Sequence, residues 1–494
     1  MTAAWMENLE LLAEAPGGVE RLRAMFTKMA ILGAFTSCAA PDFETVQLGS
    51  VVNFKNGYAF KSEWFSKSGV RLARNANVGH GTLDWRECAY LREDLAGEYS
   101  AFGLSSGDIL LSLDRPIIST GLKVAVVTDR DLPCLLLQRV AKLTPLAGRL
   151  APDFLLHWLR SPLFVNVIDP GRSNGVPHIS TKQVAALPIQ LPPLAEQHRI
   201  VAKVDELMAL CDRLEARQAD AQHAHARLVQ ALLDSLTQAR DAEEFQAAWE
   251  RVAGEFPKIF STPSSINGLQ AAFLCMAAEG KLVPEGEGAQ YLPISDLLLG
   301  DTLNGCSRKP SETPVGLQIL RISAGTGSDD FYVDEADHKW VEVTAAEREK
   351  FRLVPNDLLA CRFNGNLHYV GSFALYRGTS GVEQVFPDKL IRFRVDVGRA
   401  LPDYLRFVMN ALPARRQIEA FCATTVGNIG ISATNLKTVK LRVPSMEEQH
   451  RIVAKVTELL ALCDQLKAGI VAAQAKQAQL AEALVKQAVA TAAG

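Results

Sequence analysis

The sequence lacks the features of a secreted or membrane-bound protein. Its 494 residues include nine cysteines, an odd number with no CxxC pair, which argues against a disulfide framework or a cysteine-based zinc site. No stretch of about 18 apolar residues occurs, as a membrane-spanning helix would need. The start, MTAAWMENLE, is acidic and has no basic segment followed by an apolar run. We therefore expect a cytoplasmic protein without a membrane span.

An excess of charge of one sign is also missing. Lys and Arg number 52 against 55 Asp and Glu, which gives a formal net charge of −3. Segment 42–190 holds 16 basic and 14 acidic residues, and segment 288–442 holds 19 and 17. Nucleic-acid binding therefore cannot be inferred from charge alone.

Catalytic motifs are absent as well. Gly300–Ser307 resembles a phosphate-binding loop, but Cys306 stands where the loop requires lysine. The His residues have no HExxH-type spacing, and no NPPY- or NPPF-like tetrapeptide for amino-methyl transfer occurs. The sequence thus offers no catalytic or metal site.

The most informative feature is an internal repeat. Residues 196–214, EQHRIVAKVDELMALCDRL, match residues 448–466, EQHRIVAKVTELLALCDQL, at 16 of 19 positions with an offset of 252. The apolar helix at 19–33 has a similar counterpart at 266–280, each ending in a glycine. Repeats of this length indicate two related halves rather than a solenoid.

The repeated segments have a heptad pattern of apolar residues, which predicts coiled-coil helices that pack on each other. The seam is predicted at the following positions: Ile200, Val204, Leu207, Cys211, Leu214, Gln218, Ala221, His225, Leu228 and Leu232, then Ile452, Val456, Leu459, Cys463, Leu466, Ile470, Ala473, Gln477, Leu480 and Leu484. Pro192-Pro193 starts the first helix, and Ser445 with Glu448 predicts a capping box for the second.

Short β-type segments bounded by Gly, Asp and Pro occupy the regions before the two long helices. Examples are 46–49, 51–54, 108–111, 123–127 and 389–395. Helical stretches near 154–165 and 404–421 close each region, and a further helix is expected within 240–262. The fold class is therefore α+β, with two strand-rich globular domains carried on long helices and related by an internal pseudo-two-fold repeat.

The whole layout resembles the specificity subunit of a type I restriction–modification enzyme. The resemblance is carried by PPL-x-EQ-x-RI at Pro192–Ile200, its variant at Pro444–Ile452, and AAEGKLVP at Ala277–Pro284. Within the domains it is carried by Leu48-Gly49, Asn56-Gly57 and 69–72, and by 357–365 with Val370-Gly371. It covers nearly the whole chain, and the helix motifs are its specific part.

The resemblance implies a non-catalytic subunit with two target recognition domains, each of which binds half of a split double-stranded DNA sequence, with antiparallel helices between them. It implies two methyltransferase subunits and, in the nuclease form, restriction subunits as partners. S-adenosylmethionine and ATP with Mg would be bound by those partners, and no cofactor by this chain. The corresponding segments are 1–41 (N-terminal helices), 42–190 (first domain), 191–240 (central helix), 241–287 (connecting helices), 288–442 (second domain) and 443–494 (C-terminal helix).

Candidate DNA-binding residues are the Arg, Asn and other polar residues of domain loops, because Arg and Asn bind guanine and adenine edges bidentately. They are Lys55, Asn56, Lys61, Arg74, Asn75 and Asn77 in the first domain, and Ser307, Arg308, Lys309, Arg362, Asn364, Asn366 and His368 in the second. The repeated EQHR segments are candidate partner-binding surfaces: Glu196, Gln197, His198 and Arg199, and Glu448, Gln449, His450 and Arg451.

Two other classes of protein remain open at this point. A non-catalytic coiled-coil scaffold would have the heptads but would not need two diverged strand-rich domains. A DNA-binding regulator outside restriction–modification would normally show a helix-turn-helix or a basic helix, and neither is visible in the sequence.

Overall fold

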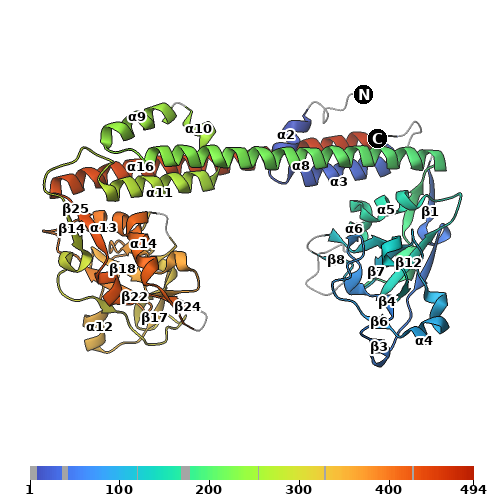
Figure 1. Cartoon of the computed structure of the whole chain (residues 1–494), viewed down its shortest axis with the longest axis horizontal. Coiled ribbons are helices and arrows are strands. Elements are labelled where there is room, and N and C mark those ends of the chain that lie inside the picture. Colours follow the sequence, from blue (N-terminus) through green and yellow to red (C-terminus); the bar gives the residue numbers. More distant parts are fainter. Residues whose placement is uncertain are drawn as a thin grey trace. The chain divides into compact units, whose positions relative to one another are not determined.

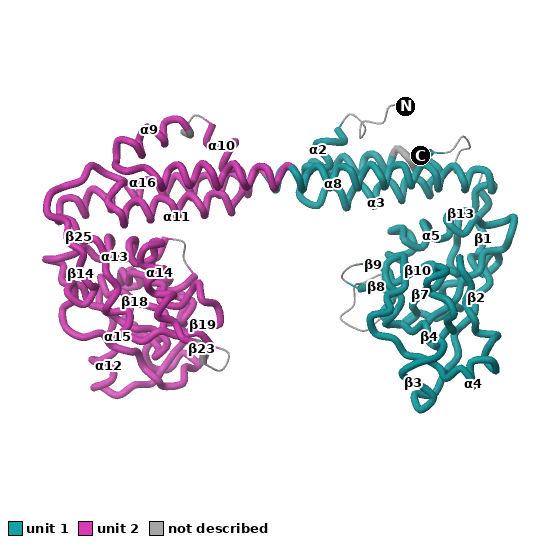
Figure 2. The backbone as a smooth tube through the Cα atoms, in the orientation of Figure 1, with its two compact units in different colours: residues 1–220, 474–494 teal, residues 221–473 magenta. Residues whose placement is uncertain are grey.

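The computed structural model describes residues 8–35, 43–118, 121–168, 178–253, 255–327, 330–425 and 428–493. The chain divides into two compact units, residues 1–220 with 474–494, and residues 221–473 (Figure 2). Each unit contains one strand-rich domain together with parts of the two long helices, α8 (Leu194–Thr237) and α16 (Met446–Ala493). This confirms the α+β class. The expected limit of the N-terminal helices at residue 41 lies outside the described residues.

The domain of unit 1 is built on a five-stranded sheet of order β2-β12-β7-β10-β5 beside a four-stranded sheet of order β11-β4-β6-β3 (Figure 1). A separate pair, β1 with β13, connects the domain to α8. The strands are β1 (Glu44–Gln47), β2 (Val52–Asn56), β3 (Phe65–Ser66), β4 (Val70–Ala73), β5 (His80–Gly81), β6 (Tyr90–Leu91), β7 (Ile109–Ser112), β8 (Ile117–Ile118), β9 (Gly121–Leu122), β10 (Val124–Val126), β11 (Cys134–Leu136), β12 (Val140–Pro145) and β13 (Pro188–Leu191).

The domain of unit 2 repeats this topology with different side chains. Its sheets have the orders β15-β22-β18-β20 and β17-β16-β21, and β14 pairs with β25 as β1 pairs with β13. A third sheet, β19-β24-β23, has no counterpart among the described strands. The strands are β14 (Gln290–Pro293), β15 (Leu303–Asn304), β16 (Leu317–Leu320), β17 (His338–Val341), β18 (Asp357–Cys361), β19 (Phe363–Asn364), β20 (Phe373–Leu375), β21 (Gln384–Val385), β22 (Leu390–Arg394), β23 (Ala423–Thr425), β24 (Asn428–Gly430) and β25 (Lys440–Val443).

Each domain is closed by two short helices where the sequence predicted one. They are α5 (Pro152–Arg160) and α6 (Pro162–Ile168), and α13 (Pro402–Asn410) and α14 (Leu412–Phe421). The breaks fall at Ser161 and Ala411, both extended with ψ 154°. At Ser161 the next residue, Pro162, disfavours the α conformation. At Ala411 the proline comes two residues later, where Pro413 lies in the first turn of α14 and has no N–H to continue α13. Helices α4 (Glu93–Ala96), α7 (Thr181–Ala185), α12 (Ala345–Phe351) and α15 (Ala433–Lys437) complete the domains.

In unit 1 the start of α8 packs against the end of α16 and against the N-terminal helices α2 (Leu9–Glu14) and α3 (Gly18–Ile31). Leu207 and Cys211 of α8, Phe26 of α3 and Ala481 of α16 belong to one buried cluster. Because the start of α8 packs on the end of α16, the two long helices are antiparallel here. Unit 1 therefore has a four-helix packing in which the short helices α2 and α3 cover the long pair.

Unit 2 has the matching arrangement, with the end of α8 and the start of α16 packed on α11 (Pro263–Glu279). Leu233 and Leu236 lie in the same cluster as Phe273, Val456 and Cys463. The expected helix within 240–262 is two helices, α9 (Ala242–Ala253) and α10 (Phe256–Ile259). Buried Phe245, Phe256 and Phe260 attach them to this cluster.

The heptad prediction holds for the first part of each long helix and is wrong further on. Leu228 is 52% exposed and Leu480 is 49% exposed, whereas Val229 and Ala481, one residue later, are buried. The step from His225 to Val229, and from Gln477 to Ala481, is therefore four residues where a heptad requires three. Successive four-residue steps follow the 3.6-residue period of an untwisted helix, so the supercoil relaxes at the same place in both copies.

A buried glutamine joins each long helix to its domain. Gln197 Oε1 accepts the N–H of Ala151 at 2.8 Å, and Nε2 donates to the carbonyls of Arg149 and Pro192, each at 2.8 Å. In the second copy Gln449 binds the N–H of Leu401 at 2.8 Å and the carbonyls of Arg399 and Pro444 at 3.3 and 3.0 Å. Both glutamines are 0% exposed, so each amide satisfies backbone groups that water cannot reach.

The predicted capping box of α16 is only half formed. Ser445 Oγ accepts the N–H of Glu448 at 3.3 Å. The Glu448 carboxylate, however, binds Arg442 at 2.7 Å and the N–H of Gly286 at 2.8 Å instead of returning to the start of the helix. A charged partner is a stronger one than a backbone amide, which explains the difference.

Replacing Gln449 with alanine should lower the free energy of unfolding of unit 2 by about 1–3 kcal/mol, because it leaves a buried N–H and two buried carbonyls without partners. The matched control is His450→Ala at the neighbouring exposed position, with an expected change within about 0.5 kcal/mol. Urea denaturation followed by circular dichroism measures both. Equal stability of the two variants would show that the amide does not hold the domain to the helix.

Candidate nucleic-acid interface

Cationic side chains of the second domain line a cavity of about 260 Å³. Its lining includes four cationic side chains, Arg308, Arg321, Lys339 and Lys389, and one carboxylate, Asp388. Arg308 was predicted from the sequence and the other cations were not. They come from the segment after β15, from β16 and β17, and from the residue before β22, so no linear motif could reveal them.

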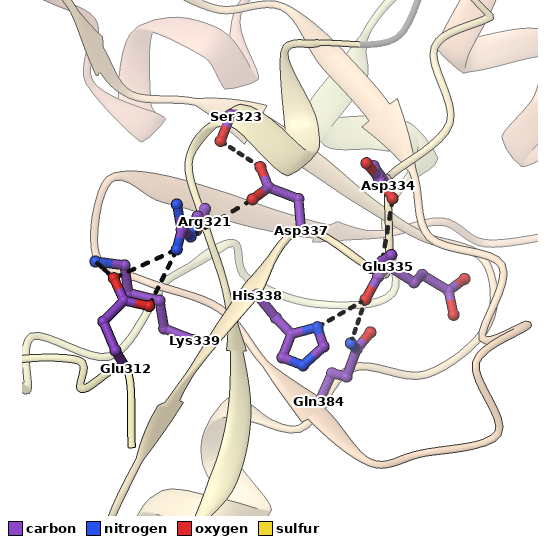
Figure 3. Close-up of polar contacts among 10 residues, drawn as sticks. Glu312, Arg321, Ser323, Asp334, Glu335, Asp337, His338, Lys339 and Gln384 are labelled. Atoms are coloured by element: carbon purple, nitrogen blue, oxygen red, sulfur yellow. Dashed lines mark hydrogen bonds and ion pairs between the residues drawn. The ribbon is translucent and has the colours of Figure 1, made fainter. Parts of the chain in front are cut away.

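Acidic neighbours hold three of these cations. Arg308 Nε contacts both carboxylate oxygens of Glu347, at 2.9 and 3.0 Å, and this ion pair together with the Thr344 N–H lowers the pKa of Glu347 to about 2. Arg321 and Lys339 share Glu312, at 3.2 and 2.7 Å (Figure 3). Ser307 and Lys309 beside Arg308 are exposed. The cations thus have fixed positions while half-exposed Arg308 keeps access to solvent.

The second predicted loop of this domain, Arg362–His368, is shaped by its own asparagines. Asn364 Oδ1 accepts the N–H of Asn366 at 3.0 Å, and Asn366 Oδ1 accepts the N–H of His368 at 3.0 Å. The guanidinium of Arg362 lies 4.7 Å from the centre of the Phe363 ring. The asparagine oxygens therefore form the turns. The Asn364 side chain also hydrogen-bonds the Cys361 thiol, and Asn366 is exposed.

A buried arginine that the sequence did not reveal stabilises this loop by hydrogen bonds to its backbone. Buried Arg415 of α14 donates to the carbonyls of Val370 at 2.7 Å and Leu367 at 3.2 Å. The same loop exposes Leu367 and Tyr369, by 37% and 38%. A rigid loop with amide donors, a cation and exposed apolar groups suits contact with base edges in a groove.

In the first domain, the predicted residues on and after β2 lie at the surface. Asn56 lines a cavity of about 560 Å³ together with Gln138, Arg139, His178 and Thr181. Its Nδ2 is 3.4 Å from Thr181 Oγ1. Lys55 donates to the Ala101 carbonyl and lies over the Phe102 ring, and Lys61 lies 5.5 Å from the Trp64 ring. Lys61 and Lys55 do not line this cavity, so the structure brings together only part of the predicted set.

The prediction for the ARNAN segment needs correction. Asn77 is 1% exposed, and its amide binds the backbone of Arg74, Asp84 and Glu87. Arg74 donates to the Glu87 carbonyl at 2.7 Å and is half-buried. Asn77 ends a short 3-10 helix, Asn75–Asn77, and its side-chain oxygen caps the start of that helix at the Arg74 N–H. Asn77 has no group left for a base.

Asn75 lies between Arg74 and Asn77 and accepts hydrogen bonds from a buried lysine, Lys123. Lys123 Nζ donates to the Asn75 carbonyl and, at 2.7 Å, to Asn75 Oδ1, which also accepts the hydroxyl of Ser112. Burial lowers the pKa of Lys123. The segment therefore supports the sheet rather than presenting side chains to a ligand.

The expectation that the whole EQHR segment is exposed is also wrong. Gln197 and Gln449 are the buried glutamines described above, and Glu196 and Glu448 are 5% and 0% exposed. Glu196 binds Arg199 at 2.5 Å. His198, Arg199, His450 and Arg451 do lie on the surface. The glutamine of each motif holds the domain, the glutamate beside it is buried, and the last two residues are exposed to a partner.

The described part of the chain has none of the other site types considered. No group of three or more His, Cys, Asp or Glu side chains within it is placed to hold a metal ion. None of its helices is long and apolar enough to cross a membrane.

Comparison with known proteins relates this geometry to a single family. Residues 41–222 match the family model described as the type I restriction modification DNA specificity domain. The type I restriction enzyme EcoAI specificity subunit of Escherichia coli is 50% identical over 193 residues, 39% of this chain. The EcoKI specificity subunit of E. coli strain K12 is 26% identical over 454 residues, 89% of this chain and 87% of that protein.

Residues 41–222 therefore form a type I restriction modification DNA specificity domain, and the chain is similar to a whole specificity subunit over 89% of its length. A specificity subunit is a non-catalytic DNA-recognition component of its enzyme, as the resemblance implied. The match to the EcoAI subunit spans about a third of that protein's length, 33%.

A solved structure supports the fold of the specificity subunit over almost its full length. The structure comes from work on complex assembly and conformational transition of the type I R-M system and has a TM-score of 0.55. It covers 91% of this chain and 98% of the other at 18% identity. The architecture with two domains and long helices is therefore a shared one.

The ion pair of Arg308 gives a direct test of the cationic cavity. Glu347→Gln should raise DNA affinity about two- to fivefold, because it releases Arg308 from an exposed ion pair. It should also steepen the dependence of log K on log salt by about 0.9 if Arg308 gains a phosphate. Fluorescence anisotropy with labelled DNA at several salt concentrations measures both quantities.

The matched control is Glu383→Gln, since Glu383 pairs with Arg348 of the same helix α12 at 2.5–3.1 Å. It removes the same charge without freeing Arg308. Identical effects of the two substitutions would mean that Arg308 has no special contact with DNA.

Proposed function

We propose that this specificity subunit binds a bipartite, asymmetric double-stranded DNA sequence, and that each strand-rich domain recognises one half. The observation that carries the proposal is one topology built twice with different side chains at equivalent places. The two domains, 42–190 and 288–442, would bind two different half-sites, whereas dimeric DNA-binding proteins bind two identical half-sites. The remaining segments, 1–41, 191–240, 241–287 and 443–494, would form the helical frame.

The candidate base and phosphate contacts are the predicted residues that the structure leaves at the surface. Arg308, Arg362 and the amides of Asn364 and Asn366 are the main candidates in the second domain. The full proposed set is Lys55, Asn56, Lys61, Ser307, Arg308, Lys309, Arg362, Asn364, Asn366 and His368. Arg74, Asn75 and Asn77 are assigned instead to the support of the first domain.

Family membership supports two methyltransferase subunits, and restriction subunits in a nuclease form, as partners. S-adenosylmethionine and ATP with Mg would bind to those partners. The exposed pairs His198-Arg199 and His450-Arg451 are equivalent positions in the two halves, so they suit two identical subunits. The formal net charge of −3 fits a chain whose partners share the phosphate contacts.

Exchange of residues 42–190 for the corresponding domain of another specificity subunit should change one half of the DNA target and leave the other half intact. The reason is that the first domain has two cores of its own away from the helices, and it is attached to α8 through the contacts of Gln197 and an apolar cluster that includes Ile200 and Val204. Methylome sequencing of cells that express the chimera with the methyltransferase subunits shows the new target.

The control is a chimera in which only residues 191–240 are exchanged. Its DNA target should stay the same in both halves. A chimera whose target changes in both halves would contradict separate readers. Absence of sequence-dependent methylation with the wild-type chain would favour a scaffold or a regulator outside restriction–modification.

A further inference from the structure

The two domains share one backbone junction that the sequence did not reveal. Gly57 in the first domain and Gly305 in the second each lie against the carbonyl of a residue two to three positions before a central strand. A Cβ on Gly57 would stand 2.1 Å from the Leu137 carbonyl oxygen, and one on Gly305 would stand 2.2 Å from that of Pro387. Both positions therefore require glycine, and both allow the same close approach of two chain segments.

Matching hydrogen bonds confirm that the junctions are equivalent. The N–H of Gln138 donates to the Tyr58 carbonyl at 2.8 Å, and that of Asp388 donates to the Cys306 carbonyl at 3.0 Å. The residues that follow, Arg139 and Lys389, accept with their carbonyls the N–H groups of Leu113 at 2.9 Å and Arg362 at 2.8 Å. Each junction thus joins the segment after β2 or β15 to the loop after β7 or β18.

Each junction projects two adjacent polar side chains, which we term the tip pair: Gln138-Arg139 in the first domain and Asp388-Lys389 in the second. Both members of each pair line the cavity already described for their domain. In the second domain the pair lies where the two predicted loops, 307–309 and 362–368, meet. A ligand that contacts both loops would therefore meet the tip pair as well.

The two tip pairs differ in their charge and in their contacts. Arg139 pairs with Asp114 at 2.8 Å, and Asp114 also contacts His178 at 3.0 Å, so the arginine is held in place. Asp388 and Lys389 form no ion pair with a described residue, because Arg308, Arg321 and Lys339 of the same cavity pair with Glu347 and Glu312 instead. The backbone is the same while the donors and acceptors differ, as expected of positions that determine specificity.

We propose that the tip pairs are specificity-determining residues, with Arg139 donating to guanine and Asp388 accepting from the amino group of cytosine or adenine. The proposal rests on the proposed function of the two domains. Asp388 is the decisive residue, because a carboxylate is repelled by phosphates and gains from DNA only where a base amino group donates to it. Gln138 beside Arg139, and Lys389 beside Asp388, offer a second contact with a base edge.

The test uses the complex of the full chain with its methyltransferase subunits. Its wild-type target is first found by methylome sequencing, and binding is then measured on duplexes with each base pair of the target changed in turn. Asp388→Asn should lower discrimination about 5- to 150-fold at one position of one half-site. Arg139→Lys, which keeps the charge but loses the bidentate fork, should do so in the other half-site only.

The controls are Asp220→Asn and Arg213→Lys, the same substitutions at exposed positions of α8. Gln138→Ala gives an independent variant, because its side chain makes no hydrogen bond with any described residue. Gln138→Ala should lower base discrimination at one position of the half-site, next to the position that Arg139 recognises. If Arg139→Lys lowers the melting temperature, Gln138→Ala alone tests the tip pair of the first domain.

The outcomes separate this inference from the proposed function. A wild-type complex without a bipartite target would overturn the proposed function itself. The wild-type complex could instead have a bipartite target, with the tip-pair variants discriminating bases at every position of it as well as the wild type does. That result would overturn only the role of the tip pairs. An equal loss of affinity for all duplexes would do the same, because it would show contact with the phosphate backbone.

Discussion

The attachment of each domain to its long helix depends on one buried amide. Gln197 and Gln449 bind, within each unit, the proline carbonyl before the helix and two backbone groups at the start of the helix that closes the domain. These groups are out of reach of water, so a side chain of another length or chemistry would leave them unsatisfied. The amide thereby fixes the direction in which the long helix leaves the domain.

The two halves differ in how the neighbouring glutamate is satisfied. Glu448 is 0% exposed and binds Arg442, which lies against Gly280 so closely that a Cβ there would stand 2.4 Å from Arg442 Cζ. The equivalent of Arg442 in the first half is Gln190, and Glu196 binds Arg199 instead. A glycine at 280 therefore leaves room for the Arg442 guanidinium, which has no counterpart at Gln190.

Features set by local sequence could be predicted, and features set by the approach of distant segments could not. The long helices, their apolar seam up to Gln218 and Ile470, and the main strands follow from periodicity and turn residues. Ala221 and Ala473 of the predicted seam are exposed. Further on, Val229 packs in one cluster with α11 and Ala481 in another with α3, and no heptad count includes these helices. The burial of Asn77 and the exposure of Arg139 and Lys389 depend on which loops meet, so residue type alone misassigned the first and missed the other two.

We propose that the long helices α8 and α16 also set the distance between the two half-sites that the domains recognise, so that the spacing follows helix length. The most direct measurement is the target of a chain with four residues inserted after Gln218 in α8 and four after its equivalent, Ile470, in α16. Four residues add about 6 Å and a net rotation of about 40° to a helix. One base pair adds about 3.4 Å and about 34° to DNA. Methylome sequencing should show both half-sites unchanged with the gap between them about one base pair longer. Methylation at the original spacing would contradict the account.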